Sequence, residues 1–322
     1  MKTPKFWSSI NPISAMLMPL SWIYYLGYRA KQKTTCSVTV PVPIICIGNL
    51  TAGGAGKTPV ALYIGKLIKN KGKKAFFISR GYSGNIISPV LVDISKHTAQ
   101  QVGDEPLLLA KILPTIVGKN RVAVAKFAIS LGAEIIIMDD GFQNHTIKKD
   151  LSFIVVDRHL SFGNGLMLPA GPLREPVKHG LKRANAVIII NPATFLPTSL
   201  PNIPIIIARS QAKPSMLAMN GKKILAFCGI AYPNKFYTML ADCGADIFEK
   251  KSFPDHYHYT NTDLEKLYKI ATEHSLQLVT TSKDATRLPE EFRNKVMVAE
   301  MELLFENSQV LEDLIEGVIS AR

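Results

Sequence analysis

The residues best suited to chemistry lie at 51–58, where Thr-Ala-Gly-Gly-Ala-Gly-Lys-Thr follows an apolar run at 44–47. The run predicts a buried strand, and a helical pattern extends from Lys57 to about Lys71. Between a strand and a helix, glycines let backbone N–H groups surround phosphate oxygens, and the helix N-terminus favours anions. We therefore expect Lys57 to reach the β/γ-phosphates of ATP and Thr58 to bind Mg²⁺. The residues expected to bind ATP are Thr51, Ala52, Gly53, Gly54, Ala55, Gly56, Lys57 and Thr58.

Two acidic pairs follow downstream. Asp139 and Asp140 come directly after the apolar run 133–138. A strand that ends in carboxylates, downstream of a phosphate loop, is a typical arrangement for holding Mg²⁺ or its waters. Asp104 and Glu105 precede Pro106, a pattern equally consistent with simple helix capping. The sequence thus predicts a metal role for the first pair and leaves the second open.

Composition excludes several classes of protein. The four cysteines (Cys36, Cys46, Cys228, Cys243) are scattered, which disfavours disulfides and zinc and fits a reducing cytosol. His256 and His258 flank a tyrosine near Asp255, but no third ligand at metal spacing appears. The four cysteines and this histidine pair give no reason to expect a transition-metal enzyme.

Positive charge is concentrated in the N-terminal part of the chain. The net charge is +13, and residues 1–92 contain twelve Lys or Arg but no Asp or Glu. An anionic partner such as a membrane surface or a phosphorylated substrate is expected, although scattered lysines also form ordinary solvated faces. Aromatic residues are not interleaved with the basic ones at 66–74, which disfavours nucleic acid.

An uncharged stretch of 23 residues runs from Phe6 to Tyr28, rich in Trp, Tyr, Met, Leu and Ile. Its length could span a bilayer, but polar residues and prolines interrupt it and its aromatic residues favour an interface. We expect a helix lying in the headgroup region, with a full span and a helix packed on the protein as alternatives. Whether this helix lies in the headgroup region or spans the bilayer, the nucleotide loop is expected on the cytoplasmic side.

The order of the elements predicts an α/β fold class. Apolar runs alternate with helical patterns, which favours a P-loop NTPase-like (RecA-like), mostly parallel sheet. The pattern resets in a Pro/Gly/Lys-containing segment at 211–221. We expect an N-terminal membrane-associated helix at 1–35, a nucleotide-binding domain at 36–212, and a smaller C-terminal α/β domain at 213–322 that closes on the active site. The long Gly/Pro-rich loop at 163–175 is expected to be functional.

Seven motifs occur in a particular order along the chain. They are Thr-Ala-Gly-Gly-Ala-Gly-Lys-Thr-Pro (51–59), Ser-Arg-Gly-Tyr (79–82), Gly-Asp-Glu-Pro (103–106), Asp-Asp-Gly-Phe-Gln (139–143), Gly-Pro-Leu-Arg-Glu-Pro (171–176), Phe-Pro-Asp-His (253–256) and Thr-Thr-Ser-Lys-Asp (280–284). Together they resemble the tetraacyldisaccharide 4′-kinases of lipid A biosynthesis, from the N-terminal helix to about residue 288. The conjunction is far more specific than any single motif.

The resemblance implies a lipid-sugar kinase. Such an enzyme uses ATP and Mg²⁺ to phosphorylate the 4′-hydroxyl of tetraacyldisaccharide 1-phosphate, which gives the 1,4′-bisphosphate precursor of lipid A. The implied partners are this acylated lipid and the cytoplasmic leaflet of the bacterial inner membrane, where the protein would be peripheral or monotopic. No obligate protein partner and no nucleic acid are implied.

The resemblance also implies roles for individual residues. Asp104, paired with a histidine of the second domain, would accept the proton of the acceptor hydroxyl. His256 matches the motif, but His258 is close enough that the register stays open. The implied metal-site residues are Thr58, Asp139, Asp140 and Glu175, and the implied substrate or phosphate contacts are Arg80, Tyr82, Glu105, Arg121 and Arg174.

One alternative belongs to another functional class. A membrane-associated P-loop ATPase that acts as a switch or assembly factor shares the phosphate loop, the acidic strand end and the basic face. It would have no need of Asp104 or His256, so the two hypotheses differ in whether a lipid accepts the phosphoryl group.

Overall fold

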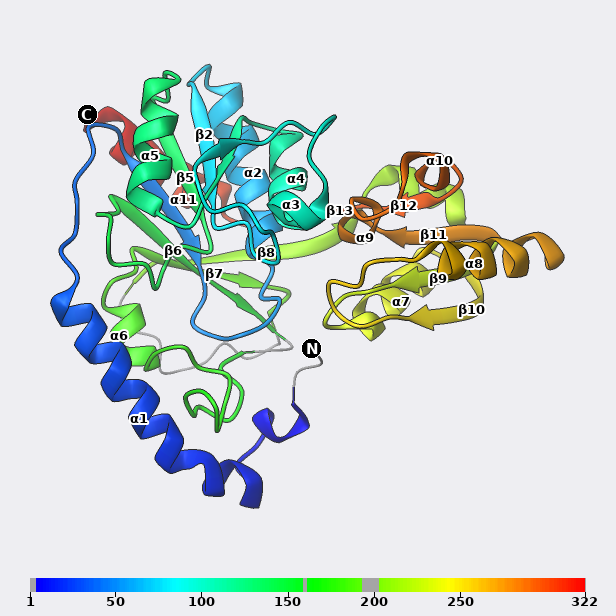
Figure 1. Cartoon of the computed structure of the whole chain (residues 1–322), viewed down its shortest axis with the longest axis horizontal. Coiled ribbons are helices and arrows are strands. Elements are labelled where there is room, and N and C mark those ends of the chain that lie inside the picture. The colour runs from blue at the N-terminus through cyan, green and yellow to red at the C-terminus, as the bar shows by residue number, and fades with distance from the viewer. Residues whose placement is uncertain (1–3, 159–160, 193–202, 322) are drawn as a thin grey trace.

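The dominant feature of the computed structural model, which describes residues 4–158, 161–192 and 203–321, is a nine-stranded sheet. Its strands are β1 (Ile44–Gly48), β2 (Ala75–Ser79), β3 (Val90–Leu91), β4 (Thr115–Val117), β5 (Ile135–Asp139), β6 (Leu151–Asp157), β7 (Ala186–Ile190), β8 (Ile205–Ala212) and β13 (Met301–Phe305). They lie in the order β13-β8-β7-β6-β1-β5-β2-β4-β3 (Figure 1). The edge strands β3 and β13 pair antiparallel, and the other pairings are parallel. The predicted α/β class is confirmed.

Helices cover both faces of this sheet, which explains why its central strands are nearly continuous apolar runs. On one face lie α2 (Lys57–Asn70), α11 (Ser308–Ser320) and the end of α4 (Asp104–Ala110); on the other lie α5 (Arg121–Ser130) and α6 (Val177–Leu181). Successive strand residues point to opposite faces, so Ile137 of β5 joins the α2 core and Ile136 joins the α5 core.

Parallel pairing brings the carboxyl ends of four strands to one edge of the sheet. Ile47 of β1 is in register with Asp139, the last residue of β5. β2 is the next neighbour and leads into Arg80, and β4 leads toward Arg121. In open parallel sheets ligands bind at this edge. The short helices α3 (Ala99–Val102) and α4 are connected to the same edge.

A second, smaller sheet forms from the part of the chain between β8 and β13. We call residues 214–299 the small unit, and the nine-stranded sheet with its helices the large unit. The smaller sheet consists of β10 (Asp246–Ser252), β9 (Lys223–Cys228), β11 (Gln277–Thr281) and β12 (Met297–Ala299), in that order and all parallel. α7 (Pro233–Asp242) packs on one face, and α8 (Asn261–Glu273) on the other. Three short helices complete it: η2 (Pro214–Met219), α9 (Ser282–Ala285) and α10 (Glu290–Arg293).

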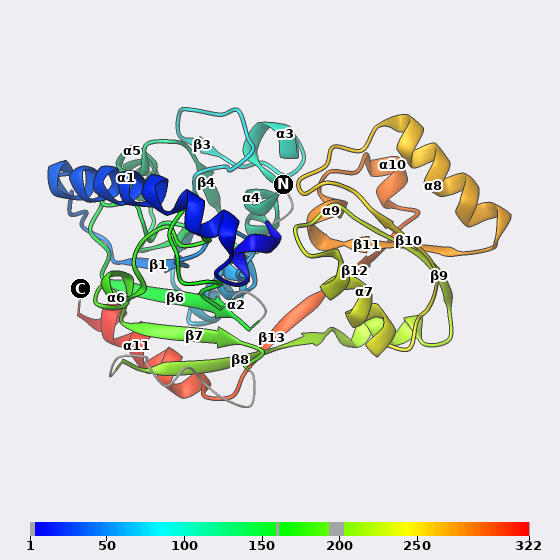
Figure 2. The same ribbon diagram turned by 90° about the horizontal axis from the view of Figure 1, so that it is seen from below.

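The two sheets are joined by a pair of antiparallel strands. β8 leaves the large sheet toward the small one and β13 returns beside it, with Met301 in register with Ala212 (Figure 2). α11 then packs Leu311 and Ile315 into the core of the large sheet. The expected C-terminal domain at 213–322 therefore differs from the structure in its last part. An amphipathic helix such as α11 can pack on either sheet, so its return to the large sheet could not be predicted from periodicity.

The N-terminal segment forms η1 (Lys5–Trp7) and α1 (Pro12–Thr34), which lie along the outside of the large unit (Figure 1). Ser21 of α1 donates to the carbonyl of Met167 (2.8 Å), and Trp7 donates to that of Pro169 (3.0 Å). Within the ranges described, no helix has both the length and the apolarity to cross a membrane.

The polarity of α1 is reversed relative to an ordinary surface helix. Its buried residues are Ser14, which forms the N-terminal capping box with Asn11, and Ser21, which contacts the 163–175 loop. Its large apolar side chains point outward, and the exposed ones are Ile13, Met16, Met18, Leu20, Trp22, Ile23, Tyr24 and Leu26. So many exposed large apolar side chains on one helix are typical of an interaction surface.

Candidate active site

The phosphate loop connects β1 to α2 at the ligand-binding edge of the sheet. Gly56 adopts φ = +80°, where any other residue would be strained, and a Cβ there would also push Cδ1 of Ile190 aside from 2.5 Å. Gly56 is also the N-cap of α2 and provides no side-chain cap. The first-turn N–H groups of α2 are therefore not capped by a side chain and remain available to an anionic ligand.

Lys57 is fixed at the mouth of this loop. Its ammonium lies 3.3 Å from Oδ1 of Asn49 and 3.5 Å from Oδ1 of Asp140. Asn49 in turn donates to the carbonyl of Thr51 (2.7 Å), which ties the lysine to the loop it serves. Lys57 and Thr58 are both buried.

The loop at 163–175 is bound to the phosphate loop through backbone contacts. The N–H of Ala52 donates to the carbonyl of Pro172 (2.7 Å), and the N–H of Arg174 donates to that of Leu50 (2.8 Å). This places the guanidinium of Arg174 2.8 Å from Asp140. The N–H of Ala52 is thus bound to the protein itself. Arg174, in contrast, lies next to Lys57 and Asp140, where phosphate is expected.

The two aspartates at the end of β5 have opposite electrostatics. Burial, together with Glu105 and Asp140, raises the pKa of Asp139 to about 7. Burial also opposes ionisation of Asp140, but Lys57 and Arg174 outweigh it and hold the pKa of Asp140 below its usual range. Both carboxylate oxygens of Asp139 are buried without a hydrogen-bond partner.

This unpartnered carboxylate fits a metal site. A buried polar group without a partner is costly, so an unpaired Asp139 is best explained by a ligand. No group of three His, Cys, Asp or Glu residues in the described part of the chain could hold a metal by itself. Mg²⁺ usually binds through one or two carboxylates, waters and substrate phosphates. The donor set is thus suited to Mg²⁺ that arrives with a nucleotide.

Asp104, at the start of α4, and His256, in the loop after β10, lie close together although they belong to different units. Nδ1 of His256 lies 3.3 Å from Oδ1 of Asp104, while His258 is exposed on the surface. His256 reaches this position from a strained turn with φ = +56°, and its N–H donates to the carbonyl of Gly229 (3.1 Å). The Asp104 hydrogen bond raises the pKa of His256. The structure therefore pairs Asp104 with His256 rather than with His258, a choice that the sequence left open.

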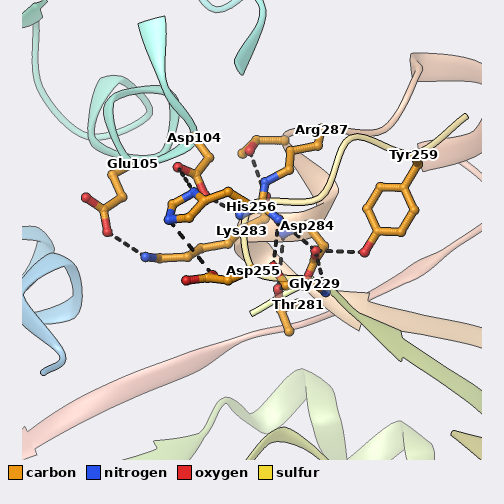
Figure 3. A network of polar contacts seen from close by, with 11 residues as sticks. Asp104, Glu105, Gly229, Asp255, His256, Tyr259, Thr281, Lys283, Asp284 and Arg287 are labelled. Atoms are coloured by element: carbon orange, nitrogen blue, oxygen red, sulfur yellow. Dashed lines mark hydrogen bonds and ion pairs between the residues drawn. The ribbon is translucent and has the colours of Figure 1, made fainter. Parts of the chain in front are cut away.

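Two cations of the small unit, which sequence reasoning did not assign, complete the region. Lys283 of α9 donates to Oε1 of Glu105 (2.5 Å), and Arg287 forms an ion pair with Asp104 (Figure 3). Glu105 is therefore held by Lys283. The motif at 280–284 contained Lys283, but its contact with a residue 178 positions away could not be read from spacing.

The expected substrate contacts Arg80, Tyr82 and Arg121 lie near this edge of the sheet. Arg121 is buried and donates to the carbonyl of Gly118 (2.8 Å), but its Nε has no partner. Burial and the neighbouring Arg80 lower the pKa of Arg121 to about 10. Tyr82 is exposed, and its ring centre lies 5.4 Å from that of His256. Two neighbouring cations, of which Arg121 has a buried N–H without a partner, suit an anionic group.

Glu175 lies in a separate network. Its carboxylate accepts hydrogen bonds from the hydroxyl of Tyr28 (2.9 Å) and from Nε2 of Gln143 (3.1 Å), and it forms an ion pair with Arg183. The side chain is fully buried. With both oxygens bound by protein donors, Glu175 links α1 to the 163–175 loop. The metal-site role that the family resemblance implies for Glu175 stays a prediction.

Known proteins resemble this chain over its full length. The family model described as tetraacyldisaccharide-1-P 4′-kinase matches residues 13–320. Relatives named tetraacyldisaccharide 4′-kinase come from Paramagnetospirillum magneticum (41% identity, 99% of each chain) and Jannaschia sp. (42%, 99% of each). The solved structure of LpxK from Aquifex aeolicus in complex with ATP has a TM-score of 0.79 at 26% identity, covering 95% of this chain and 99% of that one.

Proposed function

Because the chain belongs to the tetraacyldisaccharide-1-P 4′-kinase family, we propose that it phosphorylates the 4′-hydroxyl of tetraacyldisaccharide 1-phosphate with ATP. The product is the 1,4′-bisphosphate precursor of lipid A. The observation that carries this proposal is the pairing of Asp104 with His256 beside a phosphate loop. A switch ATPase needs the phosphate loop but has no use for a carboxylate–histidine pair supplied by two different units of the protein.

The nucleotide end of the site is built for charge stabilisation. Mg²⁺–ATP, when bound, supplies the phosphoryl group and neutralises part of its charge. Lys57 and Arg174 present cations, and the uncapped N-terminus of α2 presents N–H groups. Asp139 and the Thr58 hydroxyl would hold the metal. Such fixed donors account for most of the catalysis in phosphoryl transfer.

The acceptor end of the site handles a proton. As the 4′-oxygen forms its bond to phosphorus, its O–H bond breaks and Asp104 accepts the proton. The bond between phosphorus and the leaving ADP oxygen breaks, and ADP retains its electron pair. His256, hydrogen-bonded to the same carboxylate, orients Asp104 and favours its ionised form.

The two candidate functions predict different uses of ATP. For the kinase, release of ADP in a purified, detergent-solubilised system is expected to depend on the disaccharide acceptor. A disaccharide already phosphorylated at the 4′-position serves as the matched control and should support no more ADP release than buffer. Equal release with both lipids, or release without lipid, would favour the ATPase switch.

We also propose that the protein sits at the cytoplasmic face of the bacterial inner membrane through α1. Two observations support this: the outward apolar face of α1 and the twelve basic residues among the acid-free residues 1–92. Apolar burial at the acyl boundary and attraction to anionic lipids are the two terms that hold interfacial helices. The acyl chains of the acceptor could then stay in the bilayer while its sugar reaches Asp104.

Serine substitution of Trp22 and Ile23 together is expected to weaken vesicle binding by at least about tenfold, since each buried apolar side chain contributes about 1.5–3 kcal/mol. Both side chains are exposed on α1. Co-flotation with vesicles that contain anionic phospholipid measures the effect. The control replaces Leu217 and Phe248, which are also exposed apolar side chains but lie on the small unit. If both double variants lose binding to the same extent, α1 is not the membrane contact.

A further inference from the structure

Arg287 connects the small unit to the base of the reaction. Its Nη1 donates to Oδ1 of Asp284 (3.0 Å) and to the carbonyl of Gly229 (2.9 Å), and its Nη2 donates to Asp104 (Figure 3). The side chain is only 2% exposed. A guanidinium buried this deeply has no role in solubility, so its position calls for an explanation within the site.

Arg287 is itself held by a buried carboxylate. Asp284 is fully buried and also accepts from the N–H of Gly229 (2.9 Å), the hydroxyl of Tyr259 (2.8 Å) and that of Thr281 (2.6 Å). These donors come from different segments of the small unit. Side chains fixed in this way keep a neighbouring group in one orientation before a substrate arrives.

Asp104 consequently has a partner from the small unit on each oxygen. His256 lies at Oδ1 and Arg287 at Oδ2, whereas Asp104 belongs to α4 of the large unit. The carboxylate is 3% exposed. Its orientation therefore depends on docking of the small unit, to which the ion pairs Glu105–Lys283 and Asp157–Lys235 (2.6 Å) also contribute.

We propose that Arg287 is a positioning residue for phosphoryl transfer, which holds the Asp104 carboxylate ionised and correctly oriented. The inference rests on the proposed function, since it assigns Asp104 the role of base. Arginine is suited to this task because its planar fork binds Asp284, Gly229 and Asp104 simultaneously, and the single ammonium of lysine cannot reproduce that geometry.

The charges around Asp104 set the pH dependence that follows. From the small unit His256, Arg287 and Lys283 face it, with Asp255 behind the histidine; from the large unit Glu105 and the Tyr82 ring lie nearby. Burial opposes ionisation of Asp104, but the His256 hydrogen bond and the Arg287 charge outweigh it and lower its pKa. Removing Arg287 therefore raises that pKa, and the acid limb of the rate profile moves to higher pH.

The test compares kcat between pH 5.5 and 8.5 for the wild-type full chain, Arg287→Gln, Arg287→Lys and the control Lys269→Gln. Lys269 is an exposed cation of the same unit, so its loss should change nothing. Arg287→Gln is expected to lose about 10²-fold in kcat from misplacement of the base. Below the raised pKa its rate should fall by a further factor of about ten per pH unit relative to the wild type at the same pH. ATP affinity, measured by calorimetry, should be unchanged.

The variant Arg287→Lys keeps the charge and covers the case in which Arg287→Gln does not fold. It is expected to keep the pH dependence of the wild type with a reduced kcat, because charge is preserved and geometry is not. A wild-type kcat in Arg287→Lys, or a profile of Arg287→Gln parallel to that of the wild type, would overturn the inference. If the wild type itself transfers no phosphate to lipid, the proposed function fails, so the two failures are distinct.

Discussion

Replacement of Asp104 by asparagine is expected to lower kcat by about 10²- to 10⁴-fold, the usual contribution of a positioned general base. Asparagine keeps the shape of the side chain but cannot accept the proton of the 4′-hydroxyl. Asp104 also lies outside the phosphate loop and contacts His256 and Arg287. ATP affinity should therefore be retained. Initial rates at saturating ATP and lipid, together with nucleotide binding by calorimetry, measure the two quantities separately.

Two controls make this result interpretable. Asp242→Asn makes the same chemical change at an exposed position at the end of α7 and should leave kcat unaltered. A thermal melt of Asp104→Asn reports whether the loss of one partner of a buried ion pair has unfolded the protein. A folded variant with wild-type turnover would remove Asp104 from the mechanism.

Replacement of Asp139 by asparagine is expected to lower activity without lowering the stability of the nucleotide-free protein. Metal-ion stabilisation contributes several kcal/mol, and each 1.36 kcal/mol is tenfold in rate, so kcat should fall by about 10²- to 10³-fold. The nucleotide-free protein should melt no lower than the wild type. The raised pKa shows that the fold disfavours the charged form of Asp139, and asparagine removes this buried charge.

The same variant should lose much of the thermal stabilisation that Mg²⁺–ATP gives the wild type. Asp140→Asn is the informative comparison, because Asp140 is already paired with Lys57 and Arg174. Asp140→Asn should disturb the placement of these two cations. We do not expect it to lose the Mg²⁺-dependent thermal stabilisation to the same extent as Asp139→Asn. If Asp139→Asn keeps the wild-type response to Mg²⁺, then its unpartnered oxygens serve some other purpose.

The phosphate loop and the central sheet could be predicted from the sequence because their signals are local. Gly56 and Lys57 lie within one strand–turn–helix unit, and the apolar run before Asp139 is a buried strand in itself. The α/β class followed from the same alternation of runs. The apolar stretch of α1 was also visible, whereas its reversed packing, with Ser21 facing the protein, required the structure.

Contacts between distant residues could not be predicted in this way. Asp104 and His256 were paired only through a family resemblance, and nothing in the spacing shows that Arg287 reaches Asp104. Periodicity reports which face of an element is buried but not which carboxylate a buried cation meets. For the same reason, the sequence did not predict that α11 packs on the large sheet.

The most direct test of the central claim is the fate of the γ-phosphoryl group. The purified full-length protein is incubated with ATP labelled at the γ-position, Mg²⁺ and tetraacyldisaccharide 1-phosphate in detergent, and the lipid and aqueous phases are then separated. We predict acceptor-dependent label in the lipid, located at the 4′-position and greatly reduced in Asp104→Asn. Label that appears only as free phosphate would contradict the account.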